Sequence, residues 1–217
     1  MIVHTMPQHL EDGTANPAWL AVRLGYLTSS RVAAVFAQGK GSAEAVGRRN
    51  LRLELALESI TGQSPKREFV TQAMKDGNEL EPQAIELYQD VTANLVDAVG
   101  FIQHDTLKAG YSPDGVIGEY EGLLEVKCPE PAAHCEYLAG KIPADYLAQI
   151  THGLWLTGAQ WCDFVSYQPF FPEGKRLVVS RVLRSEALIE AHAKAVTAFL
   201  EEVNAEIGRI GALKGAA

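Results

Sequence analysis

The middle of the chain changes character from helical to extended. Residues 95–102, 111–118 and 122–127 are short, apolar-rich runs separated by glycine, aspartate and proline. Runs of this length between turn-forming residues are typical of β-strands, and three in succession predict a meander. Helical periodicity precedes and follows them. The pattern therefore predicts a mixed α/β fold in which helices flank a central mixed β-sheet.

Helices are predicted from apolar periodicity together with caps and stop residues. They cover residues 17–24, a segment opening at 28–30, residues 42–62, 70–91, 131–139 and 143–156, and a last amphipathic helix after Ser185. Further strands are expected at 161–168 and 176–183. The sequence shows no repeat or linker and its 217 residues suit one compact unit, so residues 1–217 are predicted to form a single domain.

Composition narrows the class of protein. No stretch of the sequence approaches the roughly 20 apolar residues of a membrane helix. The first residues lack a basic segment followed by an apolar run, so we expect a cytoplasmic protein without a secretory signal. Cys128, Cys135 and Cys162 show no C-x-x-C spacing and are predicted to be free thiols. Their number also argues against a cluster with four cysteine ligands.

The strongest chemical signal joins two neighbouring runs of the meander. The segment 112–115, Ser-Pro-Asp-Gly, is followed by Glu125, Val126 and Lys127. Alternate side chains of a strand share a face, so Glu125 and Lys127 point one way and Val126 the other. A turn through residues 118–122 would bring Asp114 beside them. Two carboxylates so placed suit a hard cation such as Mg²⁺, and Lys127 can act on the attacking water.

The same residues also fit an ordinary hairpin. Asp-Gly is a common turn dipeptide, and a Glu-x-Lys pair can be a solvated surface pair. However, Leu123, Leu124 and Val126 place this strand in the core, where charges are expected only if they are paired or bound to metal. That burial favours the metal site.

Glu81 is a third candidate carboxylate. It lies on the predicted helix 70–91 with Ala84, Ile85 and Tyr88 at helical spacing, which puts it on or beside the buried face. A metal is one partner for such an acid. The alternative is an acid that the helix dipole favours near the helix start.

Three polar residues are candidates for phosphate binding. Arg23 near the end of the first helix and Ser30 at the start of the next could bind an anion together. Gln149 shares a helix face with Tyr146 and Ile150. Taken singly, each has a plainer explanation: a surface cation, a helix cap and a satisfied core amide.

These residues belong to an ordered series that resembles phage lambda exonuclease and the YqaJ-type viral recombinase nucleases. Any one piece is weak, but the ordered set, from about residue 17 to 170, is specific. The series comprises Trp19-Leu-Ala-Val-Arg23-Leu-Gly25-Tyr-Leu-Thr28-Ser-Ser30, Gly77-Asn-Glu-Leu-Glu81, Ser112-Pro-Asp114-Gly, Leu124-Glu125-Val-Lys127-Cys-Pro129, Tyr146-Leu-Ala-Gln149 and Asp163-Phe-Val-Ser-Tyr167.

The resemblance implies the restriction-endonuclease-like PD-(D/E)XK fold and a site for two Mg²⁺ ions, with Mn²⁺ as an alternative. It implies metal ligands at Asp114, Glu125 and the Val126 carbonyl, and a role for Lys127 in acting on the nucleophilic water. Glu81 would support the metal directly or through water. The positions that it implies for gripping a DNA 5′-phosphate are Arg23, Ser30, Ser112 and Gln149.

The resemblance further implies a 5′-to-3′ exonuclease, encoded by a phage or prophage, that digests one strand of duplex DNA to mononucleotides. The remaining 3′ overhang would serve a single-strand annealing protein. A ring-shaped homotrimer is implied as well, and basic residues lining its channel would reconcile a net charge of −8 with DNA. Candidates for this lining are Arg48, Arg49 and Arg52, which could equally form a solvated helix face. Met74 falls where the family places an apolar wedge between strands, and a core methionine is the alternative.

One family feature is displaced. The family has an aspartate about ten residues before the catalytic one, where this chain has His104 followed by Asp105. Two other interpretations also stay open. A PD-(D/E)XK endonuclease or repair nuclease would cut closed circular DNA, and a non-catalytic DNA-end binding module would not need Asp114, Glu125 and Lys127 together.

Overall fold

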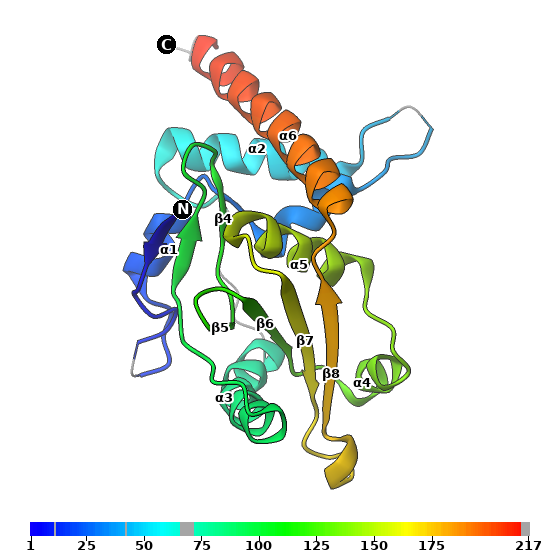
Figure 1. Cartoon of the computed structure of the whole chain (residues 1–217). Helices are drawn as coiled ribbons and strands as arrows, with labels where there is room; N and C mark the ends of the chain where they lie inside the picture. Colours follow the sequence, from blue (N-terminus) through cyan, green and yellow to red (C-terminus); the bar gives the residue numbers. More distant parts are fainter. Residues whose placement is uncertain (11, 42, 66–71, 214–217) are drawn as a thin grey trace.

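Helices and strands alternate along a mixed α/β chain, which confirms the predicted fold class (Figure 1). The computed structural model describes residues 1–10, 12–41, 43–65 and 72–213, without the side chains of residues 72–75. The helices are α1 (Pro17–Arg23), η1 (Ser29–Phe36), α2 (Val46–Thr61), α3 (Gln72–Thr92), α4 (Pro131–Leu138), α5 (Ala144–Thr157), η2 (Glu173–Lys175) and α6 (Glu186–Ala212). The strands are β1 (Ile2–His4), β2 (Leu27–Thr28), β3 (Phe101–Gln103), β4 (Ala109–Tyr111), β5 (Gly115–Ile117), β6 (Gly122–Lys127), β7 (Trp161–Tyr167) and β8 (Leu177–Leu183).

The strands form two four-stranded mixed sheets rather than one central sheet. The first has the order β1-β3-β4-β2 and the second the order β5-β6-β7-β8. The predicted strand 111–118 is divided between them, because Pro113 lacks an N–H for a ladder and the Asp114 carboxylate accepts the Val126 N–H at 2.7 Å. The chain thus leaves the first sheet after Tyr111 and enters the second at Gly115.

The predicted strand 95–102 is shorter than expected. Only Phe101–Gln103 forms a strand there, while Asp97 makes a single bridge to Val116 in β5. Its backbone exchanges two hydrogen bonds with Val116, of 2.9 and 3.0 Å. The loop before β3 therefore connects the two sheets, an arrangement that alternation of apolar residues could not distinguish from a strand.

Strand β6 is central to the second sheet. It pairs antiparallel with β5 and parallel with β7, where Lys127 is the register partner of Ser166. The parallel pair needs a crossover, which α4 and α5 provide. Leu123 of β6 packs in the cluster that α5 covers, whereas Leu124 and Val126 pack against α3 on the other face. Glu125 and Lys127 therefore face the α5 side.

Helix α2 ends as expected but begins later. Gly62 stops it with φ 65°, a left-handed conformation that glycine adopts without strain. Residue 42, the predicted start, lies outside the described residues. The prediction is nevertheless wrong, because residues 43–45 are not helical and Ala45 is extended with ψ 136°. Glu44 lies just before the helix, and its carboxylate bonds Arg48 and Arg52 in the first two turns.

Helix α6 crosses the molecule beside α2 and α5 (Figure 1). Its apolar stripe, which includes Val196, Phe199 and Val203, joins Leu27 and Leu55 in a second buried cluster. Within the described residues, no helix combines the length and the apolar composition that crossing a bilayer requires.

Candidate active site

The carboxylate of Asp114, the carboxylate of Glu125 and the ammonium group of Lys127 converge at the junction of β5 and β6. Lys127 Nζ forms an ion pair with Glu125 Oε1 and lies 3.9 Å from Asp114 Oδ2. It also donates to the Val126 carbonyl at 3.0 Å. The antiparallel pairing of β5 with β6 produces this cluster, because it sets Gly115 opposite Leu124 and so brings Asp114 opposite Glu125.

Lys127 is held on two sides. Burial acts to lower its pKa, but the charges of Glu125 and Asp114 outweigh burial and raise the pKa of Lys127. The ammonium nitrogen also lies 5.3 Å from the centroid of the Tyr146 ring on α5, within the range of a cation–π contact. The side chain is therefore charged and directed at the two carboxylates.

Glu125 is almost fully buried, with 1% of its surface exposed. Gln149 Nε2 on α5 donates to Glu125 Oε1 at 2.5 Å. Glu125 Oε2 and the Tyr111 hydroxyl are both buried without a well-formed hydrogen bond among the described residues. The two groups are neighbours: burial raises the pKa of Glu125 to about 7, while the Tyr111 hydroxyl acts in the opposite direction and lowers it. A buried carboxylate oxygen in this setting can accept the Tyr111 hydroxyl or bind a cation.

Glu81 lies within electrostatic reach of this cluster, although α3 covers the opposite face of the sheet. Burial, followed by the charge of Asp114, raises the pKa of Glu81 to about 8. Burial likewise raises the pKa of Asp114. A concentration of carboxylates that resist ionisation is characteristic of a site that holds a cation.

The donor set fits a hard divalent ion. Asp114 and Glu125 supply carboxylate oxygens, and the Val126 carbonyl follows Glu125 directly in the chain. Mg²⁺ prefers such oxygen ligands. The described residues contain no group of three or more histidine, cysteine, aspartate or glutamate side chains gathered as ligands. The side chains present therefore supply part of a coordination shell, which water and substrate oxygens would complete.

Arg23 and Ser30 line a cleft of about 330 Å³. Arg23 donates from Nη1 to Ser112 Oγ at 2.9 Å, and its guanidinium stacks 3.7 Å from the centroid of the Trp19 ring. Burial lowers the pKa of Arg23 to about 10. The structure thus brings together Arg23, Ser30 and Ser112, three of the four residues implicated in phosphate binding. Gln149, the fourth, contacts Glu125 instead.

A second cation in this cleft was not singled out from the sequence. Arg31 lines the same cleft and forms ion pairs with Glu58 and Glu54, at 3.1 and 3.2 Å. The buried Glu58 also accepts the Gly25 N–H at 3.0 Å. These pairs occupy the charge of Arg31, which gives it a role in shaping the turn around Gly25.

The predicted channel residues have partners within the chain. Arg48 and Arg52 both bind Glu44 and Glu202, so they join α2 to α6, and Arg49 is exposed. The pairs leave Arg48 and Arg52 less charge to offer to phosphates, and the channel lining stays a prediction. Met74 belongs to α3, but its side chain lies outside the described residues.

His104 and Asp105, which stand near the place of the family's additional aspartate, lie away from the cluster. Asp105 forms an ion pair with the N-terminal ammonium group at 2.6 Å, and its side chain is 66% exposed. His104 stacks on Trp155 with ring centroids 5.1 Å apart. Both lie in the β3–β4 turn, at the opposite end of β4 from Ser112.

A buried polar network holds α3 on the second sheet. Asp163 on β7 accepts from the Tyr88 hydroxyl at 2.7 Å and from Arg181 at 2.8 Å through two nitrogens. Asn94 donates to the same hydroxyl at 2.8 Å. Tyr88 lies two helical turns after Glu81, so the network fixes the helix that carries this acid. The spacing on the helix was visible in the sequence, but its partner on β7 was not.

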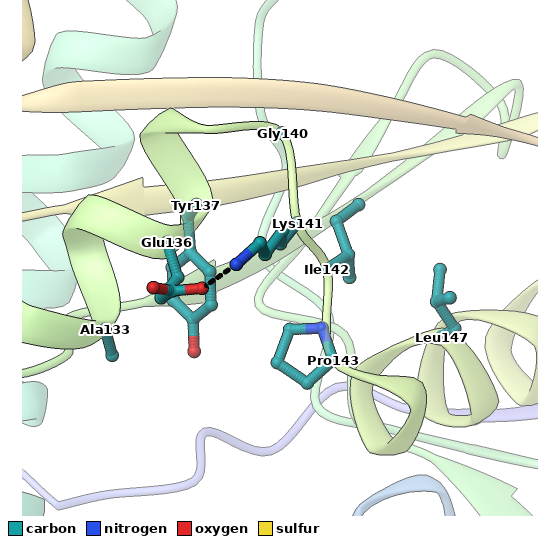
Figure 2. A pocket seen from close by; sticks show the side chains of 8 residues that line it. All are labelled: Ala133, Glu136, Tyr137, Gly140, Lys141, Ile142, Pro143 and Leu147. Carbon is teal, nitrogen blue, oxygen red and sulfur yellow. Dashed lines mark hydrogen bonds and ion pairs between the residues drawn. The ribbon is translucent and has the colours of Figure 1, made fainter.

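A separate hollow of about 810 Å³ lies between α4 and α5 (Figure 2). Figure 2 shows Tyr137, Ile142 and Leu147 lining it, with an ion pair between Lys141 and Glu136 on the α4 side. Its lining is apolar apart from this pair and includes neither Asp114 nor Glu125. The chemistry therefore belongs to the β5–β6 cluster.

Solved structures resemble this chain over most of its length. The alkaline exonuclease LHK-Exo from Laribacter hongkongensis is 39% identical, with a TM-score of 0.81 over 90% of this chain and 96% of that one. Its complex with dAMP gives a TM-score of 0.82 at the same identity and coverage. A phage related exonuclease from Haemophilus somnus 129PT is 15% identical, with a TM-score of 0.69 over 85% of this chain and 96% of that one, and so shows a shared fold. No curated protein matches the chain.

The fold and the relatives together define a nuclease of the PD-(D/E)XK type, as predicted. Residues 18–160 match the family described as YqaJ-like viral recombinase domain. The chain belongs to this family and is homologous to an alkaline exonuclease, which confirms the resemblance and the enzyme class inferred from the sequence.

Proposed function

We propose that the protein is a Mg²⁺-dependent 5′-to-3′ exonuclease that degrades one strand of duplex DNA to mononucleotides. The observation that carries the proposal is the convergence of Asp114, Glu125 and Lys127 beside the cleft of Arg23 and Ser112. Ser112 is two residues from Asp114, so a DNA end held in the cleft would lie next to the carboxylates. The dAMP bound to the relative is a nucleoside monophosphate, the product that such a reaction would release.

Asp114, Glu125 and the Val126 carbonyl would hold the metal, with Glu81 in support directly or through water. We propose two Mg²⁺ ions, for which Mn²⁺ could substitute. When bound, they would activate water as the nucleophile and offset the charge of the phosphate under attack. The buried Glu125 Oε2, which has no well-formed hydrogen bond among the described residues, supports this assignment, because a cation there would offset its charge.

Lys127 would orient the attacking water and balance phosphate charge. Its ammonium group already touches Glu125 and the Val126 carbonyl, so a small rotation would direct a proton toward water between the two acids. Gln149 holds Glu125 Oε1 from α5 and would keep that oxygen in place as Lys127 moves.

The cleft would determine the direction of digestion along the DNA strand. Arg23, Ser30 and Ser112 would bind the terminal 5′-phosphate, with the guanidinium supplying charge-assisted hydrogen bonds. Gln149 would contact the nucleotide from the Glu125 side. A phosphate anchored there leaves the next phosphodiester at the carboxylates, so hydrolysis would proceed from the 5′ end.

We also propose the assembly and partners that the family resemblance implies. Three copies would form a ring around DNA, with Arg49 and the Arg48–Arg52 pair near its channel and Met74 at the strand junction. The 3′ overhang would be passed to a single-strand annealing protein for recombination.

The test uses linear duplexes labelled at either end. Digestion with Mg²⁺ should release labelled mononucleotide from the 5′ end first and stop in EDTA. Cutting of closed circular DNA would identify an endonuclease instead, and end binding without digestion would identify a binding module. Either result would overturn the proposal.

A further inference from the structure

The turn between β7 and β8 carries an aromatic side chain in solvent. Phe170 is 90% exposed, whereas the adjacent Phe171 packs against His134 with ring centroids 4.6 Å apart. The turn projects from the end of the second sheet (Figure 1). Single exposed apolar residues are ordinary on protein surfaces. Phe170 differs from such residues in where it lies and in how its turn is held.

The turn is firmly held. Gln168 is the main anchor: its N–H donates to the Arg176 carbonyl at 2.9 Å and its Nε2 to the Pro129 carbonyl at 2.9 Å. Its own carbonyl and Oε1 accept the N–H groups of Phe171 and Phe170, at 3.2 and 3.3 Å. A ring presented on such a turn loses little further freedom when it binds a partner.

The same turn lies at the end of the sheet where the candidate active site opens. Lys127 is the register partner of Ser166, and Phe170 follows Ser166 by four residues. Four residues span at most about 13–14 Å, and the bond from Gln168 to Pro129 draws the turn toward the residues that follow Lys127. With a rise of about 3.4 Å per nucleotide along a strand, this distance corresponds to about four nucleotides.

The charge around Phe170 suits a nucleic acid. Within residues 168–176, Lys175 and Arg176 are exposed and Glu173 is the one carboxylate, while the exposed Glu130 follows Pro129, to which Gln168 is bonded. In a chain of net charge −8, a local excess of positive charge next to an exposed aromatic ring favours a polyanion that carries flat rings. Aromatic side chains stack on nucleobases of any identity, and basic neighbours track the backbone.

We propose that Phe170 stacks on a nucleobase of the DNA substrate within about four nucleotides of the bond to be cut, with Lys175 and Arg176 contacting the backbone there. This inference rests on the proposed nuclease function and deepens it. The contact would act in binding, outside the chemical step, and would tolerate any base.

The test compares Phe170→Ala with Leu183→Ala. Leu183 is 69% exposed and pairs with Trp161 at the opposite end of the sheet, so it is matched in exposure but distant from the site. Duplexes carry 2-aminopurine at each of the first five positions of either strand, and binding is measured with Ca²⁺ in place of Mg²⁺. We expect quenching at one position, lost in Phe170→Ala, and a dissociation constant raised about 5- to 100-fold. Leu183→Ala should behave as the wild type.

Unchanged affinity and quenching in Phe170→Ala would overturn the inference. A change in the mass of the protein assembly measured by light scattering would also overturn it, by showing a protein contact. Digestion of end-labelled duplex by the wild type, and its loss in Asp114→Ala, tests the nuclease proposal separately. If the wild type digests duplex and Phe170→Ala binds it with unchanged affinity and quenching, only the Phe170 contact is refuted. If the wild type neither binds nor digests duplex, both the Phe170 contact and the nuclease function are refuted.

Discussion

At the residue scale, the buried carboxylate of Glu125 is the group that a bound cation would stabilise most directly. Glu125 Oε1 accepts from both Lys127 and Gln149, while Oε2 is buried near the Tyr111 hydroxyl without a well-formed hydrogen bond among the described residues. A carboxylate in this position raises the free energy of the fold unless a cation or donor meets it. Catalytic sites often retain such groups at a cost in stability.

Replacing Asp114 or Glu125 by alanine should abolish Mg²⁺-dependent digestion. Loss of a metal that supplies several kcal/mol of charge stabilisation corresponds to about 10³-fold or more in rate. Lys127→Ala should be nearly inactive while DNA binding is kept. The measurement is the digestion rate of linear duplex, with circular dichroism to show that the variants fold. Asp105→Ala, which removes the ion pair with the N-terminus, is the control. Full activity of Asp114→Ala would contradict the site.

Arg23→Ala should weaken the preference for a 5′-phosphorylated end. Charged hydrogen bonds of this kind contribute about 1.5–3 kcal/mol, so the ratio of rates on phosphorylated and hydroxyl ends should fall about 10- to 100-fold. Lys108→Ala, whose side chain lies over the Tyr26 ring, should keep the wild-type ratio. Equal rates on both ends in the wild type would refute the pocket.

At the element scale, the contacts between α5 and α6 include a pair of buried imidazoles. His152 on α5 and His192 on α6 form a hydrogen bond of 2.9 Å. Burial lowers the pKa of His192 to about 4 and that of His152 well below its usual value. Both rings are therefore neutral in the fold at pH values where the unfolded chain would take up protons.

Stability should accordingly fall as the pH drops from about 6.5 toward 4. A group whose pKa is lowered in the fold binds its proton in the unfolded chain first, so each pH unit within this window costs about 1.4 kcal/mol per histidine. Between pH 7 and pH 5, the free energy of unfolding in urea should fall about 2 kcal/mol more in the wild type than in His192→Gln. His9→Gln is the matched control for the loss of a histidine. Parallel curves for wild type and His192→Gln would show that the pair does not titrate.

Prediction from the sequence succeeded best where one element carried the signal. The strand 122–127 and its alternating faces followed from Leu123, Leu124 and Val126 alone, and Gly62 ended its helix as expected. The division of 111–118 between two sheets was missed, because it depends on a hydrogen bond between Asp114 and Val126 that local pattern does not encode. The partner of Tyr88, Asp163, lies 75 residues away and was equally out of reach of periodicity.

At the scale of the whole molecule, some arginines are held in ion pairs between helices and others face the cleft. Arg48 and Arg52 are bound by Glu44 and Glu202 across α2 and α6, whereas Arg23 faces the cleft. An acidic protein can bind DNA through a cation that faces the substrate, which is the role proposed for Arg23.

The proposed ring predicts a defined mass in solution. Light scattering should give three times the mass of one chain, because a cyclic trimer closes with identical interfaces. Digestion of a duplex blocked at both ends by a bulky protein should then be slow, since a ring must thread onto an end. A monomer that digests blocked and open duplexes equally well would contradict the assembly.

The segment that passes from the first sheet to the second holds two contacts at a fixed separation. Ser112 meets Arg23 on one side of that passage, and Asp114 meets Val126 on the other, with Pro113 stiffening the link. Two residues span at most about 7 Å, a length of the same order as one step between phosphates. If Arg23 and Ser112 hold the terminal phosphate as proposed, this fixed length would set the cut one nucleotide away, and an extra residue inserted at 113 should lengthen the released fragments.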